Sequence, residues 1–463
     1  MIGRKLLILI LGFFIFSTTG FSIDNQFDFN KNVNIILNYR VNHSPIFING
    51  NMDFTPENGV TRGNGTENDP YIIEGWNIPY DGITYNGIQI MNTNVFFIIR
   101  NCTISGFYNG TNFEYNSIFF DNVDNGKINN ILGYENLRGI RVNLSNNILI
   151  NNCSFSNYGR PDGVGISIRY CSYIDIISCI VNDENYGITT WGCNNLLIKN
   201  CEIYNTNNAL EVSSWTSDFK IYNITISHCK IYNNNGIALD IFANRCYPTN
   251  ILIKNCHIHH NGIFDDFYSA AIDITNAFGN TVENCTIHDN GFGVYLYHSF
   301  NIIRNCSIFN HGGNELDGYM RWGIQLASGF PIIIYPAWFD KVEHCDIYNN
   351  DIGIWLANTK FSIVEKNNIY DNRYWGVFTI LRCIPRFKYN NIYGNGYDTV
   401  NFSDSAGVFQ YKSFADFRHN WWGSNQGPSR FGIREGDSVK NLLGIAICFP
   451  WLLKPIPDAG ILN

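Results

Sequence analysis

Three acidic residues, Glu211, Asp240 and Asp273, lie in successive copies of a short apolar repeat. Aligning the copies predicts that Glu211 and Asp273 share one outward column. It places Asp240 in the next column, about 8 Å from each between backbones. Carboxylates at that separation suit inverting glycoside hydrolysis, in which one protonates the leaving group and the other activates water. Mutual repulsion would raise the pKa of one of them, as an acid catalyst requires. The alternative is that these acids only solvate a strand face.

Basic and aromatic side chains are expected near these acids. Arg141 and Arg169 fall on the same predicted face a few repeats earlier, where guanidinium groups suit the carboxylates of uronic acids. A second face carries one ring per repeat: Tyr204, Tyr232, His259, His288, Phe309, Tyr348, Tyr370 and Tyr393, with Trp355 elsewhere. Such rings either shield the sheet or bind sugar rings. In the second interpretation Tyr204, Tyr232, Tyr348, Tyr370 and Trp355 contact the substrate.

Histidines concentrate in two adjacent repeats. His259 and His288 are expected to stack directly, and two imidazoles on one face offer an alternative metal site for copper or zinc. Membership of the ring column is the simpler explanation. The chain has only four methionines and no Cys-x-x-Cys motif, which argues against a sulfur-rich metal site. No cofactor is therefore predicted, and calcium and copper stay alternatives without a supporting motif.

Two repeated patterns define the elements that would position these residues. Asn-Cys-x-Ile or a variant of it recurs at intervals of 21 to 30 residues, with one gap of 39 residues before Cys345. Gly-Ile-x-Ile recurs out of phase with it. A fixed period of this size indicates a stacked array. Three short strands per repeat predict an all-β fold, a single-stranded parallel β-helix of about 13 coils with caps at both ends. Nine of the 14 cysteines share one inward slot, so a column of buried thiols is expected, with disulfides between neighbours as the alternative.

Composition and the first residues indicate where the chain acts. Arg4-Lys5 and an apolar run over residues 6–16 predict a signal peptide over residues 1–22, and thus a secreted, periplasmic or cell-surface protein. A capping segment is predicted over 23–70, the β-helix over 71–422 and a second cap over 423–463. The net charge of −8 argues against a nucleic-acid partner. No later apolar stretch reaches membrane length, so stable membrane insertion after signal removal is not expected.

Two terminal motifs carry a resemblance to a known family. The opening Gly63-Asn64-Gly65-Thr66 and the closing Asn420-Trp421-Trp422-Gly423 are similar to motifs of the NosD-like group of β-helix proteins, within the carbohydrate-binding and sugar-hydrolase class. The resemblance implies a right-handed parallel β-helix over nearly the whole mature chain. It implies little about activity, because this coil serves many functions. The leading hypothesis is a protein that binds, and in one version processes, an extracellular polysaccharide or glycan. The alternatives are a glycoside hydrolase or polysaccharide lyase using the three acids, and a periplasmic copper-site accessory protein.

Overall fold

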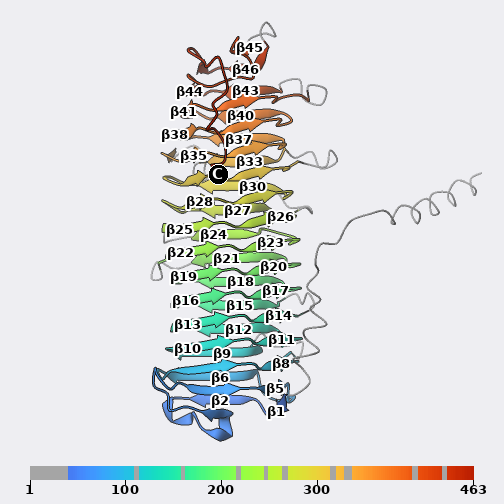
Figure 1. The fold of residues 1–463 in the computed structure, drawn as a ribbon, viewed down its shortest axis with the longest axis vertical. Helices are drawn as coiled ribbons and strands as arrows, with labels where there is room; N and C mark the ends of the chain where they lie inside the picture. The colour runs from blue at the N-terminus through green and yellow to red at the C-terminus, as the bar shows by residue number, and fades with distance from the viewer. Residues whose placement is uncertain are drawn as a thin grey trace, which may run out of the picture. The chain divides into compact units, whose positions relative to one another are not determined.

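The structure is a computed structural model that describes residues 40–108, 114–157, 162–214, 220–243, 249–262, 269–312, 320–327, 336–398, 405–429 and 435–462. The chain divides into two units, Met1–Val41 and Asn42–Asn463. The predicted signal peptide lies outside the described residues. The second unit is a stack of short strands, and the predicted all-β parallel β-helix is confirmed, with about 12 turns (Figure 1). Among the described residues, no helix combines the length and apolarity needed to span a membrane.

Each turn contributes one strand to each of three sheets, named A, B and C, and the chain visits them in the order B, C, A. The described part begins with β1 (Val41–Asn42) and has two short 3-10 helices, η2 (Asn51–Asp53) and η3 (Pro56–Asn58). Sheet A contains β1 together with β5 (Trp76–Pro79), β8 (Thr103–Ser105), β11 (Leu132–Tyr134), β14 (Ser154–Ser156), β17 (Ile180–Asn182), β20 (Glu202–Tyr204), β23 (Lys230–Tyr232), β26 (His257–His259), β29 (Thr286–His288), β32 (Ser307–Phe309), β36 (Asp346–Tyr348), β39 (Asn368–Tyr370) and β42 (Asn391–Tyr393).

Sheet B carries the longest strands. It contains β2 (Ile46–Asn49), β6 (Asn86–Thr93), β9 (Asn116–Val123), β12 (Arg138–Asn143), β15 (Val164–Arg169), β18 (Tyr186–Trp191), β21 (Asn208–Ser214), β24 (Leu239–Ala243), β27 (Ala270–Thr275), β30 (Phe292–Tyr297), β33 (Trp322–Ala327), β37 (Ile352–Ala357), β40 (Trp375–Ile380), β43 (Ala406–Tyr411), β45 (Pro428–Ser429) and β46 (Gly436–Leu442). Because β2 already pairs with β6, in-register stacking starts before Tyr71. The predicted functions of the segments 23–70 and 423–463 as caps stay predictions.

Sheet C closes each turn between the other two. It contains β3 (Val60–Arg62), β4 (Tyr71–Glu74), β7 (Phe97–Arg100), β10 (Gly126–Asn129), β13 (Asn146–Asn151), β16 (Ser172–Ile177), β19 (Asn194–Lys199), β22 (Tyr222–Ser227), β25 (Thr249–Lys254), β28 (Thr281–Glu283), β31 (Ile302–Arg304), β34 (Ala337–Trp338), β35 (Lys341–Glu343), β38 (Thr359–Glu365), β41 (Ile384–Lys388), β44 (Phe414–Asp416) and β47 (Ile445–Ile447). The pair β3–β4 is antiparallel, whereas the other sheet C pairings are parallel.

The Asn-Cys repeat has a physical explanation at the corner between sheets C and A. Its asparagine adopts a left-handed backbone, with φ of 55° at Asn200 and 53° at Asn305, which asparagine tolerates better than most residues. The asparagine amides bond from turn to turn, as Asn305 Nδ2 donates to Asn284 Oδ1 at 2.6 Å. The next residue turns inward. All 13 described cysteines are buried and free of disulfides, so the predicted thiol column is confirmed.

The register of β24 differs from the prediction by two residues. Asp240 pairs directly with Glu211 on one side and Asp273 on the other. The alignment anchored on Gly236, but Ala238 occupies the corner position that glycine fills in other turns, because the loop before β24 is longer. The predicted diagonal separation of about 8 Å is therefore wrong. The three acids form one column, with about 4.8 Å between neighbouring strands.

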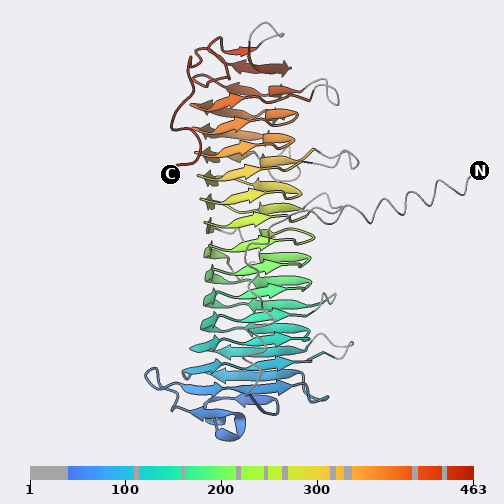
Figure 2. The same cartoon turned by 45° about the vertical axis from the view of Figure 1, so that its right-hand side comes forward.

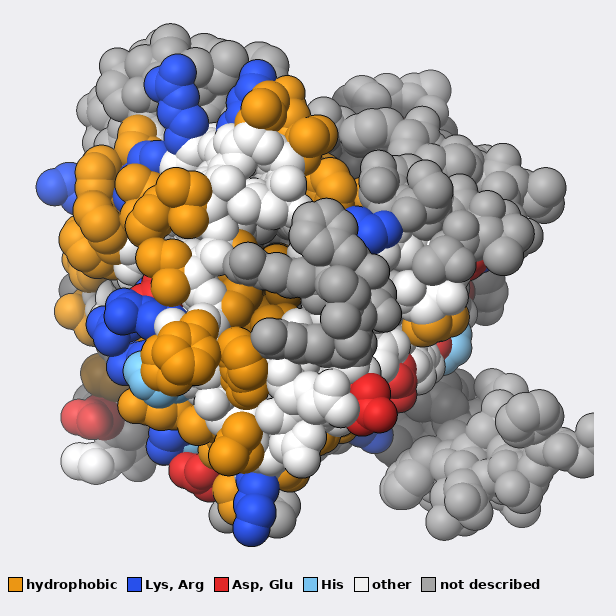
Figure 3. Space-filling view, turned by 90° about the horizontal axis from the view of Figure 1, so that it is seen from above, with side chains coloured by type: hydrophobic (Ala, Val, Ile, Leu, Met, Phe, Trp, Pro, Cys, Tyr) orange, Lys and Arg blue, Asp and Glu red, His pale blue; other side chains and the backbone are white. Residues whose placement is uncertain are grey.

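The C-terminal segment runs back along the stack (Figure 2). The N–H of Ile456 donates to Asn391 Oδ1 at 2.8 Å, and the N–H of Leu462 donates to Asn305 Oδ1 at 2.6 Å. Seen from above, the end of the stack exposes apolar side chains on one side (Figure 3). The last turn contributes Leu443 and Phe449, each 71% exposed.

Candidate functional site

The outward face of sheet B brings the predicted acidic, basic and aromatic residues into register. Its strands alternate inward apolar and outward residues, so in-register pairing aligns one outward side chain per turn. From β12 to β40 this column, the sheet B column, consists of Arg141, Ser167, Thr189, Glu211, Asp240, Asp273, Tyr295, Gln325, Trp355 and Phe378. Basic, acidic and aromatic side chains thus follow one another along a single line.

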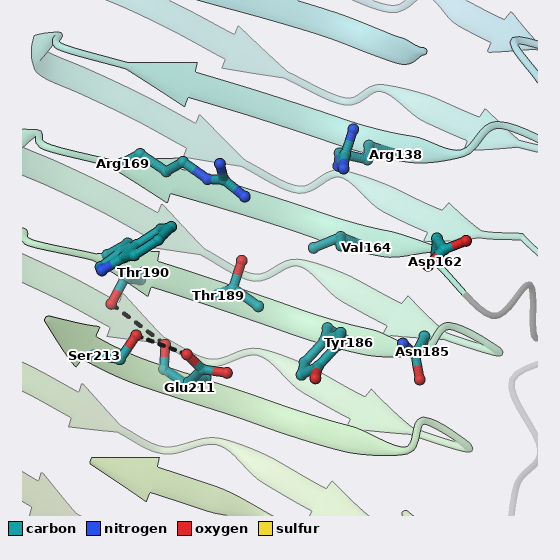
Figure 4. A pocket seen from close by; sticks show the side chains of 11 residues that line it. Arg138, Asp162, Val164, Arg169, Asn185, Tyr186, Thr189, Thr190, Glu211 and Ser213 are labelled. Atoms are coloured by element: carbon teal, nitrogen blue, oxygen red, sulfur yellow. Dashed lines mark hydrogen bonds between the residues drawn. The ribbon is translucent and has the colours of Figure 1, made fainter. Parts of the chain in front are cut away.

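A groove of about 280 Å³ lies beside the basic and acidic parts of this column. Its lining includes Arg138, Arg169, Tyr186, Trp191 and Glu211 (Figure 4). The groove is hollow because short side chains such as Thr189 lie between the longer side chains of Arg169 and Glu211. One end of the groove is therefore cationic and the other end is anionic.

Three arginines, Arg138, Arg141 and Arg169, lie near one another at this end of the sheet B face, where Arg141 Nη1 lies 3.5 Å from Glu114 Oε2. Burial, and then the neighbouring charges of Arg141 and Arg169, lower the pKa of Arg138 to about 10. Burial and Arg141 also lower the pKa of Arg169. The guanidinium of Arg169 lies 5.3 Å above the Trp191 ring, and that of Arg141 lies 5.5 Å above Phe119. Both ring contacts hold the guanidinium groups in place. The three arginines outnumber the nearby acids Glu114 and Asp162, so this end of the groove favours an anion.

The three acids differ in their hydrogen bonds. Ser213 Oγ donates to Glu211 at 2.6 Å, and Thr275 Oγ1 donates to Asp273 at 2.6 Å. The equivalent position beside Asp240 is Phe242, which has no donor. Within the described part of the chain, no hydrogen bond to the Asp240 carboxyl is found. The central acid therefore lies between two carboxylates without compensation.

This environment keeps Asp240 protonated near neutrality. Burial, then the charges of Asp273 and Glu211, raise the pKa of Asp240 to about 8. Burial raises the pKa of Asp273 to about 6, against the opposing hydrogen bond from Thr275. A carboxyl that keeps its proton to a higher pH than its neighbour Asp273 can form an acid–base pair with it. The separation expected for neighbouring strands resembles that of retaining glycosidases, about 5–5.5 Å, rather than the wider inverting arrangement expected from the sequence.

A raised pKa alone does not distinguish these acids. Burial also raises the pKa of Asp340 to about 8 and of Asp437 to about 7. Those two carboxylates accept hydrogen bonds inside the stack, from Asn301 and Asn395 respectively. Asp240 differs because it lies on the outward face beside a groove, with acids on both sides.

The predicted ring column exists on sheet A. The eight rings from Tyr204 to Tyr393 stack with centroids 4.8 to 5.2 Å apart and planes within 10° of parallel. Neighbours therefore cover both faces of each inner ring, including those of Tyr232, Tyr348 and Tyr370. Only edges reach the solvent, whereas a sugar needs an open face. Trp355 is different, since it meets Trp322 at 82° and Phe378 at 54° on sheet B.

The two histidines of the alternative metal site lie in this ring column. His259 and His288 stack at 5.1 Å with planes 6° apart, as expected. His260 and Asp289, which the sequence-based site omitted, lie closer to the metal-binding atoms of His288. The sequence-based prediction of the site also missed Arg138, Tyr186 and Trp191, which line the groove. Arg138 lies across a Gly-Ile corner from Arg141, and that Arg-Gly-Ile-Arg pattern is the signal that could have identified it.

The comparison with family models agrees with the fold. A family model described as "right handed beta helix region" matches residues 116–276 and 271–433. A mutant of the periplasmic alginate epimerase AlgG shares 13% identity over 88% of this chain and 85% of that one, with a TM-score of 0.40. The Azotobacter vinelandii mannuronan C-5 epimerase AlgE4 A-module shares 11% identity over 81% and 91%, also at 0.40. No curated protein matches significantly. On the family match, which spans more than half of its length, the chain belongs to the right-handed β-helix family.

Proposed function

We propose that the chain binds an acidic polysaccharide along the outward face of sheet B. The observation that carries this proposal is the groove in which Arg169 lies two turns, and Arg138 three turns, from Glu211. Guanidinium groups hold the carboxylates of uronic acids through paired, charge-assisted hydrogen bonds. The neutral carboxyl of Asp240 and the tilted rings of Trp355 and Phe378 continue the same face, where sugar rings can pack.

The binding test is calorimetric titration with a polyuronate and, separately, with a neutral glucan. We expect saturable binding of the polyuronate only, and a loss of at least about tenfold in affinity in Arg169→Gln. Arg386→Gln is the matched control, because Arg386 is an exposed arginine on sheet C. Equal affinity of both variants and the wild type would exclude this groove as the binding site.

Asp240 favours a second candidate function, cleavage of the bound glycan. In a retaining hydrolase the protonated Asp240 would give its proton to the glycosidic oxygen, while an ionised neighbour, Glu211 or Asp273, attacks the anomeric carbon. Water then releases the sugar from that ester. New reducing ends without an unsaturated product, lost in Asp240→Asn while binding persists, would support it. No turnover by the wild type on any bound polysaccharide would leave a binding protein.

The proposal also includes a location outside the cytoplasm and membership of the NosD-like subgroup. A polysaccharide ligand agrees with the predicted signal peptide, which implies a secreted, periplasmic or cell-surface protein. The opening motif at Gly63 and the closing motif at Trp422 support the NosD-like subgroup. In the structure Gly63 has a φ of 98° and Trp422 is fully buried.

A further inference from the structure

Away from sheet B, four histidines and one aspartate converge on the outward face of sheet A. His257 and His259 belong to β26, and His260 follows it directly. His288 ends β29 on the next turn and Asp289 follows it. Because β26 and β29 pair in register, His259 lies directly beside His288. The cluster is therefore built by two adjacent turns.

Three of these side chains can reach one ion. Ligand atoms of His260, His288 and Asp289 all lie within 4.8 Å of one another. His288 Nδ1 lies 2.6 Å from Asp289 Oδ2, and the other nitrogen, Nε2, lies 2.8 Å from His257 Nε2. His260 is exposed and the other two are partly exposed, so the point between them is open to solvent. We propose that His260, His288 and Asp289 bind a divalent first-row transition metal ion, and that His257 orients His288.

The contact between His257 and His288 prepares the second ring for this purpose. In a contact between two imidazole nitrogens, one nitrogen carries the proton and the other accepts it. In the contact as it stands, His288 Nδ1 donates to the Asp289 carboxylate, and its Nε2 accepts from His257. A metal ion bound by His288 would take the place of the Nδ1 proton. His288 Nε2 would then donate to His257, and Nδ1 would present its lone pair on the side of Asp289 and His260. A ligand histidine whose other nitrogen is held by an outer partner is the usual arrangement in metal sites. Two imidazoles and a carboxylate suit Zn²⁺, Ni²⁺ or Cu²⁺ better than Ca²⁺ or Mg²⁺.

The backbone supplies an independent observation. His260 and Asp289 have φ of 56° and 53°, in a corner that asparagine (Asn205, Asn233, Asn310) or aspartate (Asp183, Asp371) occupies in other turns. Asparagine is well suited to this left-handed conformation and bonds to its neighbours there. In the two consecutive turns of β26 and β29, this corner carries His260 and Asp289, and each of these side chains is a stronger metal ligand than asparagine. This corner also defines conservative variants, because asparagine fits the same backbone.

The test is titration of the full chain, without an affinity tag, with Zn²⁺ by isothermal calorimetry. We expect one ion per chain, and a loss of at least about tenfold in affinity in His260→Asn and in Asp289→Asn. His228→Asn is the matched control, because His228 is exposed and has a φ of 55° in another corner. It should bind like the wild type.

X-ray absorption of the zinc-loaded chain identifies the ligand atoms. We expect nitrogen and oxygen neighbours at about 2.0–2.1 Å and no sulfur, because the described thiols are buried. Three outcomes would overturn the proposal: no saturable binding by the wild type, equal affinity in all three variants, or sulfur in the zinc shell.

Discussion

Asp240 and Arg138 both lie where the protein disfavours their charged forms, with opposite consequences. Arg138 stays protonated at neutral pH because its pKa falls only to about 10. Asp240 becomes a neutral acid because its pKa rises to about 8. The groove therefore combines a cluster of arginines at one end with a reduced negative charge at the other. The arginines favour an anionic ligand at their end, and the proton on Asp240 lessens the repulsion at the acidic end.

The stability of the chain should depend on pH through Asp240. In the unfolded chain this carboxyl ionises near its ordinary pKa of 3.8, whereas in the folded chain it keeps its proton up to about pH 8. The free energy of unfolding should therefore fall as the pH rises from about 4 to about 8 and level off above that. Asp240→Asn removes this loss, and by this linkage we expect it to be more stable than the wild type by several kcal/mol, about 5, at pH 8.5 and unchanged near pH 4.

Chemical denaturation across this pH range measures the difference. Glu67→Gln is the control, since Glu67 is an exposed acid and its replacement should give a curve parallel to the wild type. A curve for Asp240→Asn that also runs parallel to the wild type would show that Asp240 ionises normally in the folded chain.

At the scale of the elements, the sequence predicts the strands that recur in every turn. It does not predict the loop lengths and corner residues that differ from one turn to the next. The apolar alternation and Asn-Cys slots identify the strands of sheet A, and the ring column follows from them. The register of β24 was mispredicted because Gly236 matches the repeated pattern, yet Ala238 fills the corner. Asp289 was missed because it lies in the corner after β29, outside the strand periodicity, whereas Arg138 is the first residue of β12 and was missed although it precedes the repeated Gly-Ile pattern. Both candidate sites therefore depend on departures from the repeat.

A ladder of buried asparagines should stabilise the turns between sheets A and B. Asn372 Nδ2 donates to the carbonyls of Ile347 and Tyr370, and its Oδ1 accepts from the backbone N–H of Asn350. Asn372→Ala leaves these groups buried without partners, so we expect a loss of about 3 kcal/mol. Asn207→Ala, in an exposed ladder, should change stability by less than about 0.5 kcal/mol.

Thermal and chemical denaturation distinguish the two asparagine variants. Asn372 and Asn207 are both asparagines that bond from turn to turn, and they differ in that Asn372 is buried and Asn207 is exposed. Equal destabilisation by Asn372→Ala and Asn207→Ala would mean that burial of the ladder contributes nothing.

On the scale of the whole stack, each turn contacts mainly its two neighbours, so stability is a sum of local terms rather than one global core. The C-terminal segment is an exception. It bonds to Lys366, Asn368 and Asn391 in sheet A turns, and its last described residue, Leu462, bonds to Asn305. This segment therefore links several turns that otherwise contact only their neighbours.

Lifting this segment should loosen only the turns that it crosses. A Cβ at Gly460 would lie 2.3 Å from both Asn368 Nδ2 and Asp346 Oδ1, so Gly460→Ala must displace the segment. Gly82→Ala has a similar backbone, φ of 86° against 89°, but nothing lies within 4 Å of its Cβ. We expect amide exchange in β36, β39 and β42 to accelerate by about tenfold in Gly460→Ala, equivalent to about 1.4 kcal/mol, with β12 to β18 unchanged. Gly82→Ala should leave all of these strands unchanged. Acceleration in every turn would instead mean that the stack opens as one cooperative unit, and no acceleration would mean that the segment does not stabilise it.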